Sequence, residues 1–210
     1  MISDYDGNEA DFLLISDFPT NFIRNRNMIS SSEIPNLSRP IALVGLMGAG
    51  KSKIGKALSD IFNVAFIDTD EVIENVAGMN IPTIFDLYGE KKFREIEARE
   101  IANLVSSKPA ILSTGGGAFI NEETRAIINK DAFSVWLKAK PETLAGRISN
   151  TASRPLLKDK DPVEVLRTLS KQRSPFYEQA HLTIDTDGMS LNTAIDKVTS
   201  VMIETLSKVS

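Results

Sequence analysis

The stretch from Ile41 to Ser52 constrains this chain more than any other. Four apolar residues, 41–44, predict a buried strand, which then breaks into the pattern G-x-x-x-x-G-K-S over residues 45–52. Glycines at this spacing let the backbone turn its N–H groups toward a phosphate without interference from Cβ atoms. Residues 53–62 have apolar positions at helical spacing, so the phosphate would lie at a helix N-terminus, which favours an anion. A plain glycine-rich turn is the alternative, but the flanking strand and helix favour a nucleotide-binding P-loop.

The chemistry of such a loop assigns its charged and hydroxyl side chains. Lys51 would reach the β- and γ-phosphates of the nucleotide, and the Ser52 hydroxyl would ligate Mg²⁺. The residues expected to surround the phosphates are Gly48, Ala49, Gly50, Lys51, Ser52 and Lys53.

Four more apolar runs follow, separated by helical patterns. The runs are 64–67, 110–112, 133–137 and 181–185, and the helices are expected at 71–76, 81–106, 141–149, 162–177 and 191–206. Strands that alternate with helices predict an α/β fold, here a five-stranded parallel sheet flanked by helices. In such sheets ligands bind at the carboxyl ends of the strands.

Composition excludes several classes of function. The net charge is −4 and the pI about 5.2, so nothing favours nucleic acid or an anionic membrane as a partner. The chain has no cysteine and one histidine, His181, which removes thiolate and histidine metal sites. No apolar run approaches the ~18 residues of a membrane span. We expect a cytoplasmic protein, and His181, at a strand start, is most simply structural.

The first 39 residues differ from the rest. They carry early acids and no basic segment followed by an apolar core, which argues against a signal or transit peptide. Ser30–Ser32 and the prolines at 35 and 40 are typical of a linker. We predict a largely disordered extension over 1–39 and one domain over 40–210, although the apolar cluster 12–15 offers a segment that could pack on it.

Two acids follow the second predicted strand. Asp68 and Asp70 lie two apart, so in extended chain both would point to the same side. One could hold a magnesium-bound water and the other a hydroxyl of an acceptor substrate. Capping of the following helix is the alternative. Since capping needs one oxygen and the pair lies at the ligand-binding edge, we favour the functional interpretation.

Three later segments are less specific. In the helix 81–106, which we expect to break near Gly89, Arg94 lies three residues from Glu97, and an exposed ion pair would explain it. Residues 115–117 are three glycines at a strand end, which indicates either close approach of a ligand or a flexible turn. Residues 151–161 are polar and charged, as in a mobile lid that closes over a phosphoryl transfer.

Taken together, the motifs resemble those of the shikimate kinase family, within the nucleoside-monophosphate-kinase-like P-loop proteins. The resemblance runs from about residue 40 to the end and rests on an ordered set of segments: GLMGAGKS at 45–52, FIDTD at 66–70, GEKKFREIE at 89–97, TGGG at 114–117, RPLL at 154–157 and RSPFY at 173–177. It implies a P-loop kinase fold with a lid at 151–161 and a substrate-binding helical region at 69–106. The extension before Ile41 is longer than the family needs.

The resemblance also implies a reaction and its residues. The family transfers the γ-phosphate of ATP to the 3-hydroxyl of shikimate, on the route to aromatic amino acids, with Mg²⁺. Ser52 and Asp68 would hold the metal, and Asp70 would bind the acceptor hydroxyls. Arg94 and Arg173 would bind the carboxylate of shikimate, beside the glycines 115–117 (Gly115, Gly116 and Gly117), with Gly116 donating a backbone hydrogen bond. On the nucleotide, Arg154 would contact the phosphates and Arg147 would lie against adenine.

Physical chemistry is consistent with these roles. Arginine binds a planar carboxylate better than lysine does, and phosphoryl transfer needs positioning and charge neutralisation rather than a nucleophilic side chain. We take Lys51, Asp70 and Arg154 as the catalytic candidates, ATP and shikimate as the ligands, and a monomer as the expected state. The alternatives are another small-molecule P-loop kinase, such as a gluconate kinase, and a non-catalytic nucleotide-binding regulator.

Overall fold

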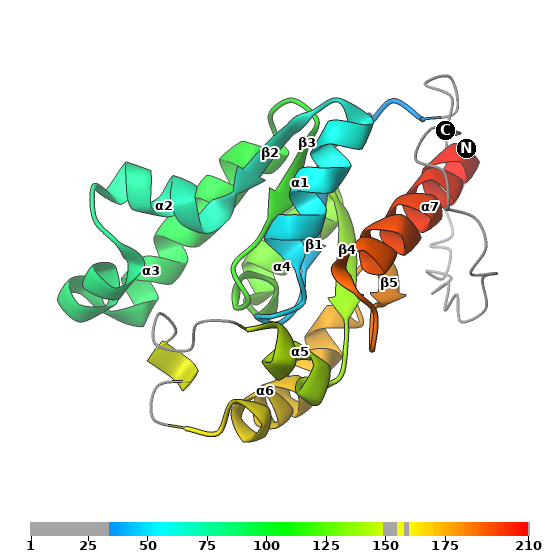
Figure 1. Cartoon of the computed structure of the whole chain (residues 1–210). Helices are drawn as coiled ribbons and strands as arrows, with labels where there is room; N and C mark the ends of the chain where they lie inside the picture. Colours follow the sequence, from blue (N-terminus) through cyan, green and yellow to red (C-terminus); the bar gives the residue numbers. More distant parts are fainter. Residues whose placement is uncertain (1–33, 149–154, 158–159, 210) are drawn as a thin grey trace, which may run out of the picture.

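A computed structural model of the chain describes residues 34–148, 155–157 and 160–209. Its centre is a parallel five-stranded sheet in the order β2-β3-β1-β4-β5 (Figure 1). This confirms the predicted α/β architecture. The strands are β1 (Ile41–Val44), β2 (Ala65–Asp68), β3 (Ala110–Ser113), β4 (Phe133–Lys138) and β5 (Leu182–Asp185).

The strand that precedes the P-loop lies in the middle of the sheet. All four residues of β1 are fully buried, and the strand pairs with β3 on one side and β4 on the other. The second strand is different, because β2 is an edge strand in which Ala65 is exposed and the other three residues are partly buried. The apolar run 64–67 predicts a buried strand, and this prediction was wrong, because an apolar run alone does not distinguish a central strand from an edge strand.

Helices cover both faces of the sheet. α1 (Lys51–Phe62) packs beside α7 (Leu191–Val209) on one face, and α3 (Ile81–Val105) packs against α4 (Glu122–Asp131). α5 (Pro141–Arg147) packs against α6 (Pro162–Tyr177), near the carboxyl ends of the strands. α2 (Thr69–Ala77) and the first half of α3 project from the sheet as a separate lobe (Figure 1). Among the described helices, none combines the length and apolar character that crossing a membrane requires.

The lobe of α2 and α3 has a small core of its own. Ile73, Ile84 and Phe93 are buried together there. The expected break at Gly89 is confirmed, since this residue has φ 76° and ψ 170° inside α3. The spacing of apolar residues along 81–106 predicts burial of Leu87 and Tyr88, but their side chains are 64% and 57% exposed. They directly precede the break, where the helical period that predicted their burial stops.

One region was not predicted at all. A 3₁₀ turn at Ala118–Ile120 and helix α4 follow the three glycines. Asn121 caps α4, because its side chain accepts a hydrogen bond from the Thr124 N–H at 2.9 Å. An asparagine followed by two glutamates in the first turn is a recognisable helix start, so the signal was present in the sequence.

Two predicted segments lie mostly outside the described residues. Of the extension 1–39, the structure describes 34–39, where Ile34 and Leu37 pack against the main core. Of the lid 151–161, it describes 155–157 and 160–161. Within that part the Leu157 side chain is buried, whereas Leu156 is 48% exposed.

Candidate active site

The P-loop has the geometry of a phosphate site. Gly48 and Gly50 have φ of 83° and 89°, and a side chain at Gly48 would lie 2.5 Å from the Leu144 carbonyl oxygen of α5. Lys51 Nζ donates hydrogen bonds to the carbonyls of Gly45 and Leu46, at 2.8 and 3.1 Å. These bonds hold the ammonium group over the loop at the N-terminus of α1. The predicted P-loop is therefore formed as expected, and an exposed Lys53 follows in the first turn.

Three oxygen-bearing side chains meet beside the loop. Ser52 Oγ donates to Asp68 Oδ2 at 2.9 Å and lies 3.1 Å from Ser113 Oγ. Asp68 Oδ1 accepts from the Asp70 N–H at 3.1 Å and so caps α2. One oxygen of Asp68 thus caps the helix, as the alternative predicted, and the other faces Ser52. A role of Asp68 toward Mg²⁺ stays a prediction.

These donors fit a hard cation. No group of three or more His, Cys, Asp or Glu that could hold a metal occurs among the described residues. Mg²⁺ in kinases needs less than that, since it keeps several waters and takes other ligands from the phosphates. A hydroxyl and a carboxylate next to the P-loop match this requirement.

Asp70 reaches the site from a helix. It lies in the first turn of α2, so the expected extended-chain alternation with Asp68 was wrong, because the strand ends at Asp68. Burial raises the pKa of Asp70, and the charge of Asp68 adds to this, while Lys51 and Arg94 act in the opposite direction. A side chain at Gly115 would lie 2.8 Å from Asp70 Oδ1. The carboxylate therefore lies close to the glycine loop, residues 115–117, and the positive charges of Lys51 and Arg94 both act on its pKa.

Arg94 is held by a buried partner. Its Nη1 donates to Glu97 Oε2 at 2.6 Å, and its Nη2 donates to Glu90 at 3.2 Å. The side chain of Glu97 is 2% exposed and that of Arg94 25%, so this is not the exposed pair that the sequence favoured. Burial raises the pKa of Glu97, and Arg94 lowers it. A side chain at Gly117 would lie 2.6 Å from Arg94 Nη2, which places the guanidinium at the glycine loop.

A second arginine reaches the same loop from α6. Arg173 Nη1 donates to the Gly116 carbonyl at 2.9 Å, and Tyr177 Oη donates to the same oxygen at 2.6 Å. The structure thus shows the carbonyl of Gly116 as an acceptor, and the expected donation from the Gly116 N–H to a ligand stays a prediction. Tyr177 is 1% exposed and was missed, although it lies in the motif RSPFY. The burial of Glu97 was missed too, because the sequence indicated only an exposed ion pair between Glu97 and Arg94.

The two remaining arginines differ in what the structure shows. Arg147, at the end of α5, donates to the carbonyls of Thr186 and Met189 at 2.6 and 3.0 Å. Arg154 lies outside the described residues. His181 is structural as expected, since its Nδ1 accepts from the Ser134 N–H at 3.1 Å and its ring stacks on Phe133.

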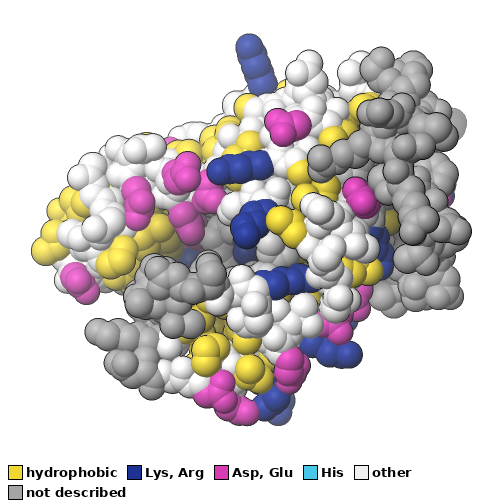
Figure 2. Space-filling view, in the orientation of Figure 1, with side chains coloured by type: hydrophobic (Ala, Val, Ile, Leu, Met, Phe, Trp, Pro, Cys, Tyr) yellow, Lys and Arg dark blue, Asp and Glu magenta, His cyan; other side chains and the backbone are white. Residues whose placement is uncertain are grey.

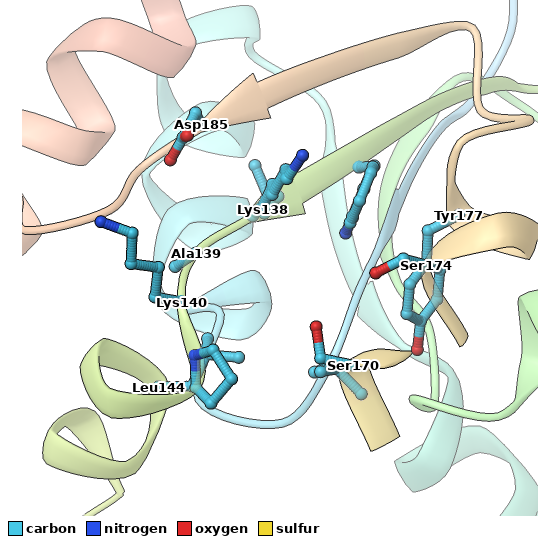
Figure 3. Close-up of a pocket in the computed structure, with 12 residues that line it drawn as sticks. Lys138, Ala139, Lys140, Leu144, Ser170, Ser174, Tyr177 and Asp185 are labelled. Atoms are coloured by element: carbon cyan, nitrogen blue, oxygen red, sulfur yellow. The ribbon is translucent and has the colours of Figure 1, made fainter. Parts of the chain in front are cut away.

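The surface and an adjoining cavity complete the picture. Acidic side chains gather over α2, and basic side chains lie beside them over α1 (Figure 2). A cavity of about 200 Å³ lies between β4, α5 and α6, with Tyr177 and Ser174 on one side and Lys138 on another (Figure 3). Leu46 of the P-loop lines this cavity too.

The fold and the P-loop together define the class of P-loop kinases, and two arginines lie at the glycine loop. A family model described as shikimate kinase matches residues 47–205. A shikimate kinase from Caulobacter vibrioides is 43% identical over 175 residues, 83% of this chain and 88% of the relative. The chain belongs to the shikimate kinase family, and it is a kinase that phosphorylates shikimate with ATP.

Solved structures agree with this assignment. A shikimate kinase from Acinetobacter baumannii in complex with shikimate is 35% identical, with a TM-score of 0.73 over 81% of this chain and 94% of that chain. A gluconokinase from Sinorhizobium meliloti is 17% identical, with a TM-score of 0.52 over 84% of this chain and 99% of that chain. The second likeness shows a shared fold alone, so it gives no support to the gluconate kinase alternative.

Proposed function

We propose that this chain transfers the γ-phosphoryl group of ATP to the 3-hydroxyl of shikimate, giving shikimate 3-phosphate and ADP. The observation that carries this proposal is the convergence of Arg94 and Arg173 on one glycine loop. Arg94 comes from α3 and lies against Gly117, while Arg173 comes from α6 and binds Gly116. The two planar guanidinium groups lie at neighbouring glycines. This arrangement suits a carboxylate, because a guanidinium group can bind a carboxylate through two parallel hydrogen bonds.

The buried partner of Arg94 supports a role in binding. A charged pair on a helix surface contributes little, whereas a carboxylate buried as deeply as Glu97 is expensive unless a cation holds it. Fixing Arg94 on Glu97 orients its guanidinium before the substrate arrives. Less side-chain freedom is then lost on binding, which favours affinity.

Asp70 is the group proposed to act on the hydroxyl. Its Oδ1 lies at Gly115 of the glycine loop, and the charges of Lys51 and Arg94 both act to lower its pKa. From there its carboxylate can accept a hydrogen bond from the attacking hydroxyl and orient it toward the phosphate. We propose that Asp70 mainly orients the hydroxyl rather than abstracting its proton, because a loose phosphoryl-transfer transition state needs little help from a general base.

The nucleotide side is proposed from the P-loop contacts. Lys51 would leave the carbonyls of Gly45 and Leu46 for the β- and γ-phosphates, which also meet the N–H groups at the start of α1. Ser52 would bind Mg²⁺ directly and Asp68 through water, and the ion would neutralise charge on the transferring phosphoryl group. Arg147 beside adenine and Arg154 on the phosphates remain proposals from the family pattern.

The test offers competing acceptors to one preparation of enzyme. ADP release is measured with shikimate, gluconate and nucleoside monophosphates in separate reactions, and the product is located by ³¹P–¹H correlation. We expect turnover with shikimate and phosphate on its 3-oxygen. Turnover with gluconate alone would identify a different small-molecule kinase, and ATP binding without any turnover would identify a regulator.

The two arginines are then tested individually. Arg94→Ala and Arg173→Ala should each weaken shikimate binding about ten- to hundredfold, because a hydrogen bond to a charged group contributes about 1.5–3 kcal/mol. ATP affinity, measured by calorimetry on the same samples, should change little. An equal loss for ATP and shikimate would refute the proposed clamp.

A further inference from the structure

The glycine loop is tied to distant elements at two of its residues. The Gly115 N–H donates to Thr69 Oγ1 of α2 at 3.2 Å, and the Gly116 carbonyl is bound from α6. The oxygens of Gly115 and Gly117 accept local hydrogen bonds, from the N–H groups of Ala118 and Ile120 at 3.1 and 3.0 Å. The oxygen of Gly116 instead accepts from α6, through Tyr177 and Arg173. Three consecutive glycines carry no side chains to anchor them. The bonds to Gly116 therefore tie the loop to a distant element.

Two donors on one carbonyl fix the orientation of a whole peptide unit. A carbonyl oxygen has two lone pairs, and here each has a partner. Because the peptide group is planar and trans, the N–H of Gly117 points opposite to the Gly116 carbonyl. With the oxygen held toward α6, this N–H faces away from α6. The direction of a backbone donor in the proposed shikimate site is set by the bonds behind it.

Tyr177 is the more rigid of the two donors. Its side chain is buried in the last turn of α6, and its ring lies 5.7 Å from that of Trp136 on β4. The ring forms part of the cavity wall opposite Lys138 (Figure 3). Burial raises the pKa of Tyr177 to about 12, so the hydroxyl stays protonated and can donate throughout the neutral range. Arg173, by contrast, is partly exposed and has other N–H groups to offer a ligand.

We propose that Tyr177 is a positioning residue for shikimate binding, holding the Gly116–Gly117 peptide and steadying Arg173 without touching the substrate. This inference rests on the proposed function, in which Arg173 binds the shikimate carboxylate. Tyr177 and Arg173 share one acceptor, so loss of the hydroxyl leaves Arg173 as the remaining α6 donor to that oxygen. The peptide and the guanidinium can then adopt more than one arrangement, and shikimate must select the productive one.

The test variant is Tyr177→Phe, which removes one oxygen and keeps the ring. We expect the KM for shikimate to rise roughly three- to tenfold, as for loss of one neutral hydrogen bond. The kcat and the KM for ATP should stay within about twofold. If Tyr177 had a purely structural role, the variant would instead have a lower melting temperature, and the KM for shikimate would not rise more than the KM for ATP. Emission of Trp136, the one tryptophan of the chain, checks that the ring packing beside residue 177 is retained.

Ser134→Ala is the matched control. Its hydroxyl also makes a short bond inside the protein, to Asn129 at 2.7 Å, but it contacts His181 rather than the glycine loop. We expect Ser134→Ala to leave both KM values unchanged. An unchanged shikimate KM in Tyr177→Phe, or an equal rise for ATP, would overturn the inference.

A third variant separates this inference from the proposed function. If Arg173→Ala raises the KM for shikimate and Tyr177→Phe does not, the carboxylate clamp stands and the positioning role of Tyr177 is wrong. If Arg173→Ala leaves that KM unchanged, the clamp itself is wrong, and the inference that rests on it is overturned as well.

Discussion

A methyl group at Gly117 would test the placement of Arg94 from the other side of the contact. An alanine Cβ there would lie 2.6, 2.7 and 2.9 Å from Nη2, Nη1 and Cζ of Arg94. Gly117 has φ −104°, which alanine adopts without strain, so the backbone can stay where it is. The guanidinium must therefore move, by about 0.8 Å if it is to reach the 3.4 Å of ordinary contact.

The size of the effect follows from this displacement. A hydrogen bond of about 2.9 Å that lengthens by 0.8 Å is no longer a hydrogen bond. Loss of one charge-assisted bond to the shikimate carboxylate costs about 1.5–3 kcal/mol, so Gly117→Ala should weaken shikimate binding roughly ten- to hundredfold. ATP affinity should not change. Calorimetric titration with each ligand measures both, and Gly146→Ala is the control, because a Cβ at Gly146 meets no atom within 4 Å.

A double-mutant cycle tests whether the methyl group acts through Arg94. If the methyl group acts by displacing Arg94, then Gly117→Ala should have little further effect in the Arg94→Ala background, since the displaced group is already absent. Additive losses would show that the methyl group blocks the substrate directly. A normal shikimate affinity in the single variant would show that Arg94 does not bind the ligand from its observed position.

Three further outcomes are expected. Asp68→Asn keeps an N-cap for α2 but loses a charge, so the variant should be as stable as the wild type and should regain part of its lost kcat when free Mg²⁺ is raised. If Mg²⁺ rescues Asp70→Asn equally, the proposed division between a metal-binding Asp68 and a hydroxyl-binding Asp70 is wrong. Asp70→Asn should also raise the melting temperature of the ligand-free protein at pH 7, because the raised pKa of Asp70 means that its ionisation destabilises the fold. The difference in melting temperature from the wild type should shrink as the pH is lowered toward 4, where the wild-type carboxyl becomes protonated in both states. Burial lowers the pKa of His181, with Arg39 adding to this, so the fold should lose stability as the pH falls from about 7 through the folded-state pKa; His181→Asn should flatten that part of the curve in denaturation experiments.

The sequence predicted the elements whose signal is local. The P-loop was recognisable because glycine spacing, the apolar strand and the helix all lie within residues 41–62, and each supports the same conclusion. The sheet followed from alternation of strands and helices for the same reason. The break in α3 was predicted because Gly89 is a strong local signal. Asp68 and Asp70 were predicted as site residues because they follow a strand at the edge where such sheets bind ligands, and they lie beside Ser52 and the glycine loop.

The parts that were missed depend on partners distant in sequence. Glu97 looks like a surface acid until α3 packs against the sheet and buries it beside the glycine loop. The role of Tyr177 depends on a carbonyl 61 residues away. Both residues lie in recognisable motifs, GEKKFREIE and RSPFY, but the motifs do not show which contacts the two side chains make. Burial of polar side chains is decided by tertiary contacts, and apolar periodicity does not report it.

The long separations in this site also bear on how the protein is made. Thr114 binds the Leu43 carbonyl across 71 residues, and Arg173 binds Gly116 across 57. Contacts of this kind form late, because the chain between them must be ordered first. Because α6 follows both the P-loop and the glycine loop in the chain, a growing polypeptide has its phosphate loop before Arg173 and Tyr177 are made and can hold Gly116.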